Sequence, residues 1–257
     1  MAGSLLAPRS WASVVATIRS GGKILIGLDV DGTLAPIVRR PELVRVPLRT
    51  LRILERASRA RRVRIVILSA RSLADLKWLL PVRGVRRIGQ YGLEGALGPS
   101  ARERSRIRTS CGSLARELTH SVAGIPGAWI EIKGLTVAVH DRAVAARRLR
   151  TLRRAVTGVF PRARRLGFLP APGRRVTDFV PAGFDKGMAL RGAVAEYRPQ
   201  TVFYFGDSLS DEPAFRSLGR GDFPVRVGPG ATRAPYRVAD LGGVTRVLSA
   251  VIRLRVG

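Results

Sequence analysis

The chain has 257 residues and a formal net charge of +28 at pH 7, with 46 Lys and Arg against 18 Asp and Glu. This length allows a sizeable core in one or two domains, and the single cysteine excludes a disulfide framework and any multi-cysteine metal site. No apolar run approaches the roughly 20 residues that a membrane span requires, so we expect a cytoplasmic protein that contacts no membrane.

The positive charge by itself favours nucleic-acid binding. However, only four of the basic residues are lysines, so 42 of the 46 are arginine, which is typical of a coding bias. The arginines are scattered and lack the interleaved aromatic residues that a base-stacking surface needs. We therefore expect no specific nucleic-acid partner and predict that the charge attracts small anionic substrates. A steeply salt-dependent affinity for DNA or RNA would support the alternative.

In chain order, the sequence predicts an α/β core. An amphipathic helix is expected over residues 11–18, in preference to a cleavable leader. Three continuous apolar runs follow, typical of strands covered on both faces, and they end at Asp29, Ser69 and Gly206-Asp207. The strands are predicted over residues 23–28, 64–68 and 201–205, and further helices over 48–60, 72–80 and 186–196. This order predicts a doubly wound parallel-sheet, Rossmann-like core, with its site at the strand ends.

The middle of the chain predicts an α+β insert. Its expected elements are the two strands of a hairpin, an arginine-rich helix and one further strand, over residues 128–132, 135–140, 143–160 and 175–180. Because these strands pair locally, we expect residues 98–182 to form an α+β insert between the two halves of the core. The catalytic core then comprises residues 1–97 and 183–257.

Two carboxylates lie at the end of the first predicted strand. Asp29 and Asp31 are two residues apart, so in an extended chain they point to the same side, and Gly32 lets the chain turn away. Such carboxylates repel each other unless a divalent cation binds between them. One is able to attack phosphorus while the other transfers the proton. Taken alone, the motif also fits a turn that carries solvated acids.

Further polar groups at corresponding positions favour phosphoryl transfer. Asp207 and Asp211 form a second acidic cluster, in which we expect Asp207 to bind magnesium directly and Asp211 to lie in a second layer of ligands. Ser69 is placed to donate a hydrogen bond to a phosphate oxygen. Lys186, at a helix start, is placed to neutralise the phosphate charge. These elements, each at a strand end or a helix start, together predict a phosphatase.

With these motifs the chain resembles the haloacid dehalogenase superfamily, and within it the trehalose-6-phosphate phosphatases. The resemblance rests on the blocks LDVDGTLAPIV, AWIEIKGLTVAVHDR, FDKGMAL and YFGDSLSDEPAF, at residues 28–38, 128–142, 184–190 and 204–215. It implies that Asp29 is the nucleophile and that Asp31 is the acid/base. It further implies phosphate binding by Thr33, Ser69 and Lys186, substrate binding by Arg71 and by Glu131 and Lys133 of a mobile cap, and magnesium binding by Asp29, Asp31 (through its carbonyl), Asp207 and Asp211.

Several positions depart from the family pattern. They are Ala70 in place of glycine, Tyr91 in place of histidine, Ser208 and Ser210 in place of aspartate and threonine, and Asp178 and Val180 in place of glutamate and arginine. None of them removes the nucleophile, the acid/base, the phosphate lysine or the first metal carboxylate. We expect them to affect the choice of sugar and the rate more than the reaction.

The resemblance predicts a magnesium-dependent enzyme of trehalose biosynthesis that hydrolyses trehalose 6-phosphate through an aspartyl-phosphate. We expect this enzyme to be a monomer. Alternatives are the same chemistry on sucrose phosphate, or on mannosyl or glucosyl phosphoglycerate. A non-catalytic sugar-phosphate-binding domain is disfavoured by the intact Asp29, Asp31, Lys186 and Asp207. For Glu131 and Lys133, which alternate along one strand face, the residues alone favour a solvated cross-strand pair.

Overall fold

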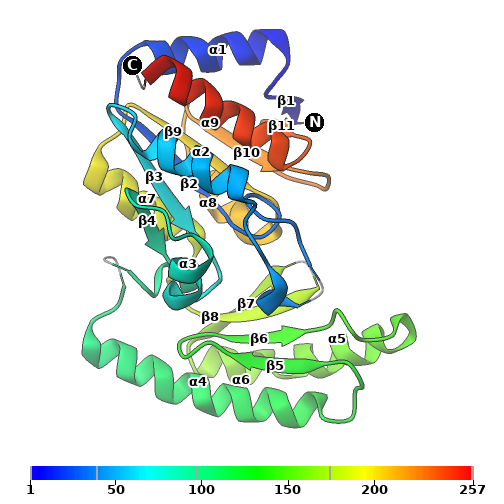
Figure 1. Cartoon of the computed structure of the whole chain (residues 1–257). Helices are drawn as coiled ribbons and strands as arrows, with labels where there is room; N and C mark the ends of the chain where they lie inside the picture. The colour runs from blue at the N-terminus through cyan, green and yellow to red at the C-terminus, as the bar shows by residue number, and fades with distance from the viewer. Residues whose placement is uncertain (1, 39, 96–97, 174, 256–257) are drawn as a thin grey trace. The chain divides into compact units, whose positions relative to one another are not determined.

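The computed structural model describes residues 2–38, 40–95, 98–173 and 175–255 (Figure 1). The chain divides into two compact units. The core unit joins Met1–Gly95 to Asp185–Gly257, and the inserted unit is Ala96–Phe184. The boundary predicted at residue 97 lies outside the described residues. Among the described helices, none is both long and apolar enough to cross a membrane.

The centre of the core unit is a seven-stranded parallel sheet in the order β1-β11-β10-β9-β2-β3-β4. Its strands are β1 (Gly3–Ser4), β2 (Ile24–Leu28), β3 (Val63–Leu68), β4 (Val85–Ile88), β9 (Thr201–Gly206), β10 (Phe223–Val227) and β11 (Tyr236–Val238). The interior strand β2 is buried along its whole length and pairs with β3 and β9. The ends of the three predicted strands therefore meet at one edge, and the predicted parallel core is confirmed.

Helices cover both faces of this sheet (Figure 1). One face shares an apolar core with α1 (Pro8–Arg19), α2 (Leu48–Ser58), α3 (Leu73–Leu79) and α9 (Leu241–Arg255). The other face packs against α7 (Lys186–Tyr197) and α8 (Glu212–Arg216). Because side chains alternate along a strand, Ile24, Ile26 and Leu28 of β2 enter the first core, whereas Gly27 lies against Leu190 of α7.

The inserted unit is a four-stranded antiparallel sheet, in the order β5-β6-β8-β7, with helices on one face. Its strands are β5 (Trp129–Ile132), β6 (Val137–His140), β7 (Phe168–Gly173) and β8 (Val176–Pro181), and its helices are α4 (Ala101–Val122), α5 (Leu149–Gly158) and α6 (Phe160–Arg165). Val137, Val139 and Phe179 point into the core with the helices. The predicted hairpin and third strand, and hence the α+β character of the insert, are confirmed.

The helix predicted over residues 143–160 is wrong at its start. Helix α5 begins at Leu149, after the 3-10 turn η3 (Ala146–Arg148). Arg175 holds the preceding segment in a turn, because its guanidinium donates to the carbonyl oxygens of Asp141 and Val144 at 2.7 and 3.4 Å. This anchor is distant in sequence, so helical periodicity does not reveal it.

The edge strand β7 was not predicted. It contains Pro170 and Pro172, and proline weakens a strand signal because it lacks the backbone N–H of a sheet ladder. Among the described strands, β7 pairs only with β8, and at an edge the missing N–H groups cost little. The prolines are therefore compatible with a strand only at this place in the sheet.

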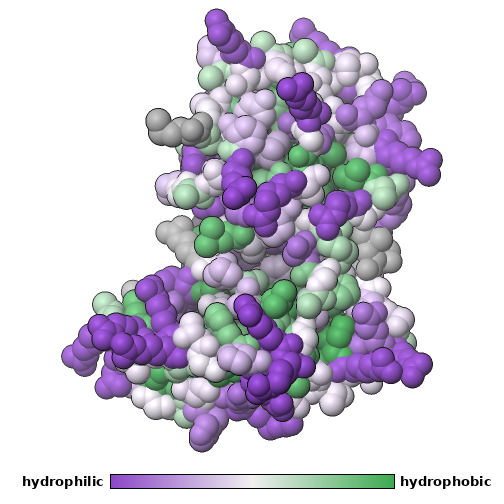
Figure 2. Space-filling model, turned by 180° about the vertical axis from the view of Figure 1, so that it is seen from behind, coloured by the Kyte–Doolittle hydropathy of each residue, from purple (hydrophilic) through white to green (hydrophobic). Residues whose placement is uncertain are grey.

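Hydrophilic side chains are distributed over the visible surface of both units. Figure 2 shows them interspersed with apolar ones, and no single hydrophilic patch dominates that face. This distribution agrees with the scattering of arginine along the chain.

Candidate active site

Asp29 follows β2 at the carboxyl edge of the core sheet. It is buried, and its backbone N–H donates to the carbonyl of Phe205 on β9 at 3.0 Å. Gly32 then turns the chain with a φ of 81°, and a Cβ there would lie 2.1 Å from Oδ2 of Asp207. Both the left-handed backbone and the close approach require glycine. The glycine thus lets the loop after β2 contact the loop after β9.

Lys186 is the first residue of α7, which Asp185 caps by accepting from the Met188 N–H at 2.6 Å. Its ammonium lies 2.8 Å from Oδ2 of Asp29 and 2.7 Å from Oδ1 of Asp211, and 2% of its side chain is exposed. Burial acts to lower the pKa of Lys186, but Asp211 and Asp29 outweigh it and raise the pKa above its ordinary value. Lys186 is therefore a fixed positive charge beside Asp29 at neutral pH.

Asp211 is fully buried, and both of its carboxylate oxygens accept hydrogen bonds. Oδ1 accepts from Lys186 and from the Tyr204 hydroxyl, the latter at 2.8 Å, and Oδ2 accepts from the N–H and the hydroxyl of Ser208 at 3.0 and 2.9 Å. The Tyr204 ring lies so close to Gly27 that a Cβ there would be 2.6 Å away. These bonds suit Asp211 to a second layer behind a metal better than to direct ligation.

Asp29, Asp207 and Asp211 form an acidic group whose ligand oxygens lie within 4.8 Å of one another. Burial raises the pKa of Asp29 well above its ordinary value, although Lys186 acts to lower it. Burial also raises the pKa of Asp207 to about 6, and Asp211 adds to this rise. Three carboxylates beside Lys186 leave an excess of negative charge, which a divalent cation would offset. Oxygen donors of this kind fit a magnesium ion.

The Asp31 carboxylate is paired with the guanidinium of Arg71. Nε and Nη2 of Arg71 donate to the two carboxylate oxygens at 2.7 and 2.8 Å, which is the bidentate geometry typical of strong arginine–carboxylate pairs. Nη2 also donates to the carbonyl of Pro41 at 3.2 Å, in the 3-10 turn η1 (Pro41–Leu43). The residue predicted as acid/base and the arginine predicted to bind substrate are thus in direct contact, which was not predicted.

The two hydroxyls predicted to bind phosphate, those of Thr33 and Ser69, are both buried. In the part of the chain that the structure describes, the Thr33 hydroxyl has no hydrogen-bond partner. A buried polar group without a partner is costly, and a ligand oxygen at this place would satisfy it. Ser69 Oγ accepts from the backbone N–H of Arg71 at 3.2 Å, so Ser69 also fixes the start of the loop that carries Arg71.

The strained segment at Gln90 and Tyr91 holds the loop that carries Ser69 and Arg71 in place through backbone hydrogen bonds. Gln90 and Tyr91 adopt left-handed conformations with φ of 45° and 62°, which cost about 1–3 kcal/mol each for residues other than glycine. Their backbone N–H groups donate to the carbonyls of Arg71 and Ser69, at 2.8 and 3.1 Å. Tyr91, which stands where the family has histidine, is buried. The support for Ser69 and Arg71 therefore comes from the backbone of this segment.

In the inserted unit, Glu131 and Lys133 belong to an ionic cluster on the sheet face opposite the helices. Glu131, Ala138 and Asp178 lie side by side in register on β5, β6 and β8. Lys133 Nζ lies 2.8 Å from Oδ1 of Asp178 and 3.7 Å from Oε2 of Glu131, and Glu131 Oε2 lies 2.8 Å from Nε2 of His140. Only 12% of the Lys133 side chain and 3% of the Asp178 side chain are exposed. The expectation of a solvated residue is therefore wrong for Lys133, whereas Glu131, its partner at 3.7 Å, is 29% exposed.

Three further residues near these sites were not predicted: Tyr204, His140 and Arg226. Arg226 of β10 is buried and in register with Gly206. Its positive charge opposes the rise in the pKa of Asp207 that burial causes, and its Nε and Nη1 have no hydrogen-bond partner among the described residues. Because this arginine interrupts the apolar run FPVRV, the sequence could have indicated a buried charged residue at this position. Tyr204, within an apolar aromatic run, has no such signal.

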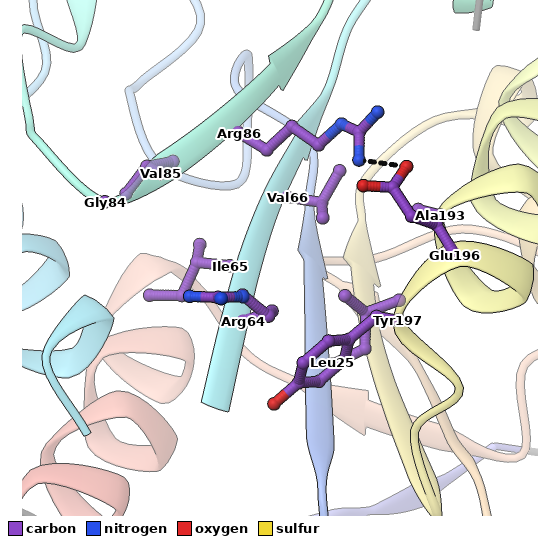
Figure 3. A pocket seen from close by; sticks show the side chains of 10 residues that line it. All are labelled: Leu25, Arg64, Ile65, Val66, Gly84, Val85, Arg86, Ala193, Glu196 and Tyr197. Atoms are coloured by element: carbon purple, nitrogen blue, oxygen red, sulfur yellow. Dashed lines mark ion pairs between the residues drawn. The ribbon is translucent and has the colours of Figure 1, made fainter. Parts of the chain in front are cut away.

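A pocket of about 500 Å³ lies elsewhere in the core unit, between β3, β4 and α7 (Figure 3). Its lining includes Leu25, Arg64 and Tyr197, and the ion pair of Arg86 with Glu196. These residues lie near the amino-terminal ends of the strands, and none of them is a predicted site residue. The chemistry-bearing side chains are at the carboxyl ends, so this pocket is not the candidate active site.

Comparison with known sequences relates the chain to one family. The sequence pattern of the family described as trehalose-phosphatase matches residues 27–239. The trehalose-6-phosphate phosphatase of Escherichia coli (strain K12) is 31% identical over 225 residues, which cover 84% of this chain and 82% of that protein.

Comparison with solved structures agrees on the fold. The C-terminal domain of a Candida albicans trehalose-6-phosphate phosphatase matches with a TM-score of 0.86 and 20% identity, covering 99% of each chain. A phosphatase of the haloalkanoate (HAD) superfamily from Bacteroides thetaiotaomicron matches with a TM-score of 0.57 and 17% identity, covering 90% of this chain and 96% of that chain. At these identities the likeness shows the fold alone.

Proposed function

Because this chain belongs to the trehalose-phosphatase family and is a phosphoric monoester hydrolase, we propose that it hydrolyses trehalose 6-phosphate to trehalose and phosphate. In this proposal magnesium is the cofactor and an aspartyl-phosphate on Asp29 is the intermediate. The observation that carries it is the buried contact of 2.8 Å between the Asp29 carboxylate and the Lys186 ammonium, at the carboxyl edge of the sheet.

Asp29 attacks the phosphorus atom through a carboxylate oxygen, and the bond from phosphorus to the sugar oxygen breaks. Lys186 stabilises the negative charge on the transferring group. The Thr33 hydroxyl, buried without a partner among the described residues, donates to one phosphoryl oxygen, and Ser69 donates to another. Water then attacks the same phosphorus atom, which releases phosphate and restores Asp29.

Asp31 transfers the protons of both steps. It protonates the leaving sugar oxygen and later takes a proton from the attacking water. Both oxygens of its carboxylate accept hydrogen bonds from Arg71 in this structure. To transfer protons, Asp31 must therefore release Arg71 and contact the sugar oxygen or the attacking water instead. Arg71 is then available to the substrate, as predicted for it.

A magnesium ion would be held by Asp29, Asp207 and the backbone carbonyl of Asp31, with Asp211 in the second layer. When bound, it supplies charge neutralisation for the phosphoryl oxygens. We further propose that residues 98–182 act as a cap and that Glu131 and Lys133 of this cap bind the sugar. The monomeric state and the cytoplasmic location stay predictions.

The test is phosphate release from trehalose 6-phosphate, with magnesium and with a chelator, beside sucrose 6-phosphate and glucose 6-phosphate. We expect magnesium-dependent release confined to trehalose 6-phosphate. Release from sucrose 6-phosphate instead would retain the chemistry and change the substrate. Release from none of the three esters would contradict the proposal.

A further inference from the structure

Trp129 and His140 form a stacked pair on the inserted unit's sheet. They lie directly opposite each other on β5 and β6, and their rings are parallel within 4° with centroids 3.9 Å apart. Trp129 is 38% exposed, whereas His140 is 9% exposed. The indole therefore covers the imidazole and fixes the plane in which its nitrogens lie.

The fixed imidazole contacts the carboxylate of Glu131. Nε2 of His140 lies 2.8 Å from Oε2 of Glu131, two residues along β5 from Trp129 and on the same sheet face. The residue opposite Glu131 is the small Ala138, which leaves room for this diagonal contact. Lys133 approaches the same oxygen at 3.7 Å, so His140 and Lys133 both hold Oε2.

We propose that His140, held by Trp129, is a positioning residue that sets the orientation of Glu131 for the sugar, and so contributes to substrate selectivity. This rests on the proposed function, in which Glu131 contacts the sugar. A carboxylate accepts hydrogen bonds from sugar hydroxyls only in defined directions. A carboxylate already oriented before binding loses less conformational freedom when the sugar binds.

The experiment compares kcat and KM for trehalose 6-phosphate and for p-nitrophenyl phosphate, which has no sugar. The variants are His140→Ala, His140→Gln, Trp129→Phe, Glu131→Gln and the double variant of His140→Ala with Glu131→Gln. We expect His140→Ala to raise KM for trehalose 6-phosphate about tenfold, with a smaller change in kcat. The ratio of kcat/KM between the two substrates then falls by a similar factor.

Conservative variants and the double variant show whether His140 positions Glu131 or only stabilises the inserted unit. His140→Gln keeps an N–H donor for Glu131, so we expect it to recover much of the activity that His140→Ala loses. Trp129→Phe keeps a stacking ring, so we expect it to lose much less activity than His140→Ala. The double variant should be no worse than Glu131→Gln alone, because His140 acts through Glu131. The matched control is His120→Ala, which changes the other histidine of the chain, exposed on α4, and should leave both activities unchanged.

Additive losses in the double variant, or equal losses on both substrates, would overturn the proposal. His140→Gln and Trp129→Phe still test it if His140→Ala does not fold. Wild-type enzyme that releases no phosphate from trehalose 6-phosphate would overturn the proposed function, and this inference with it. Normal wild-type hydrolysis with additive losses would overturn the role of His140 alone.

Discussion

Each unit of the molecule contains a lysine placed between two carboxylates. In the core unit, Lys186 lies 2.8 Å from Asp29 and 2.7 Å from Asp211. In the inserted unit, Lys133 lies 2.8 Å from Asp178 and 3.7 Å from Glu131. The first lysine is 2% exposed and the second 12%. The chemistry of the two groups is similar, but their burial and their assembly differ.

The assembly follows from the two kinds of sheet. Parallel strands bring all of their carboxyl ends to one edge, so Asp29 and Asp211 meet although they come from loops far apart in sequence. In the antiparallel sheet, the cluster forms across β5, β6 and β8, because the small Ala138 between Glu131 and Asp178 leaves space for Lys133. The parallel sheet of the core unit places its polar groups in a buried cluster at one edge. The antiparallel sheet of the inserted unit places its polar groups on one face.

The sharpest test of this difference is the change Asp29→Asn. We expect turnover to fall by at least about a thousandfold, because an amide cannot replace the carboxylate nucleophile. Substrate binding should persist, since Lys186 keeps its contact with Asp211 at 2.7 Å. Phosphate release and calorimetric binding of trehalose 6-phosphate measure the two effects.

Its matched control is Asp75→Asn, an exposed aspartate in the first turn of α3, which should change neither quantity. Substantial activity remaining in Asp29→Asn would rule out the covalent mechanism. The group around Lys186 would then no longer differ from the group around Lys133 by containing a nucleophile.

The next effect is on stability. Lys186→Met leaves Asp29 and Asp211 buried without their shared cation, so we expect the free energy of unfolding to fall by about 3–5 kcal/mol. Lys133→Met should cost less, about 1–3 kcal/mol, because it leaves one buried carboxylate, Asp178, without its close cation, whereas Glu131 is 29% exposed and water can solvate it. Urea unfolding of both variants at neutral pH, in a chelator, makes the comparison, and equal losses would contradict the difference in burial.

The difference between groups that meet at strand ends and groups that meet across strands also explains which parts of the structure could be predicted from the sequence. Asp29, Ser69 and Asp207 directly follow apolar runs that became β2, β3 and β9, and the geometry of a parallel sheet brings such positions together. For this reason the fold of the core and the placing of its polar side chains followed from residues alone. The contact of Arg71 with Asp31 did not, because it depends on side-chain rotamers in two loops.

In the inserted unit, the residues alone favoured the wrong interpretation of Lys133. Its burial depends on the register of β6 with β8, which places Asp178 beside Ala138, and no local pattern specifies that register. The prolines of β7 also concealed the edge of this sheet. Sequence patterns therefore predicted which side chains meet at the strand ends and missed a cluster made across strands.

Magnesium should stabilise only the core group. At a concentration of about 100 times its Kd, it should add about 2.7 kcal/mol to the free energy of unfolding. We expect this gain to disappear in Asp207→Asn and to persist in Lys133→Ala, with thermal unfolding as the measurement. An undiminished gain in Asp207→Asn would mean that the ion binds elsewhere.

The gain should also depend on pH. Because burial raises the pKa of Asp207 to about 6, protons compete with the ion as the pH falls through that value. The stabilisation by magnesium should therefore be larger at pH 7 than at pH 5, and thermal unfolding with and without the ion at both pH values measures the difference.

The smallest expected effect is on selectivity, through Lys133→Ala. We expect kcat/KM for trehalose 6-phosphate to fall about tenfold and kcat/KM for p-nitrophenyl phosphate to fall much less, since Lys133 lies in the inserted unit and the aryl ester presents no sugar. Removing the ammonium also leaves the buried Asp178 without the partner at 2.8 Å, so the melting temperature must be measured alongside. The paired change of Lys133→Ala with Asp178→Asn relieves that buried charge. If the double variant restores the melting temperature but not the selectivity, Lys133 contacts the sugar. If the double variant restores both, the ionic cluster acts only by stabilising the inserted unit. Lys133 and Lys186 then differ in function as well as in burial.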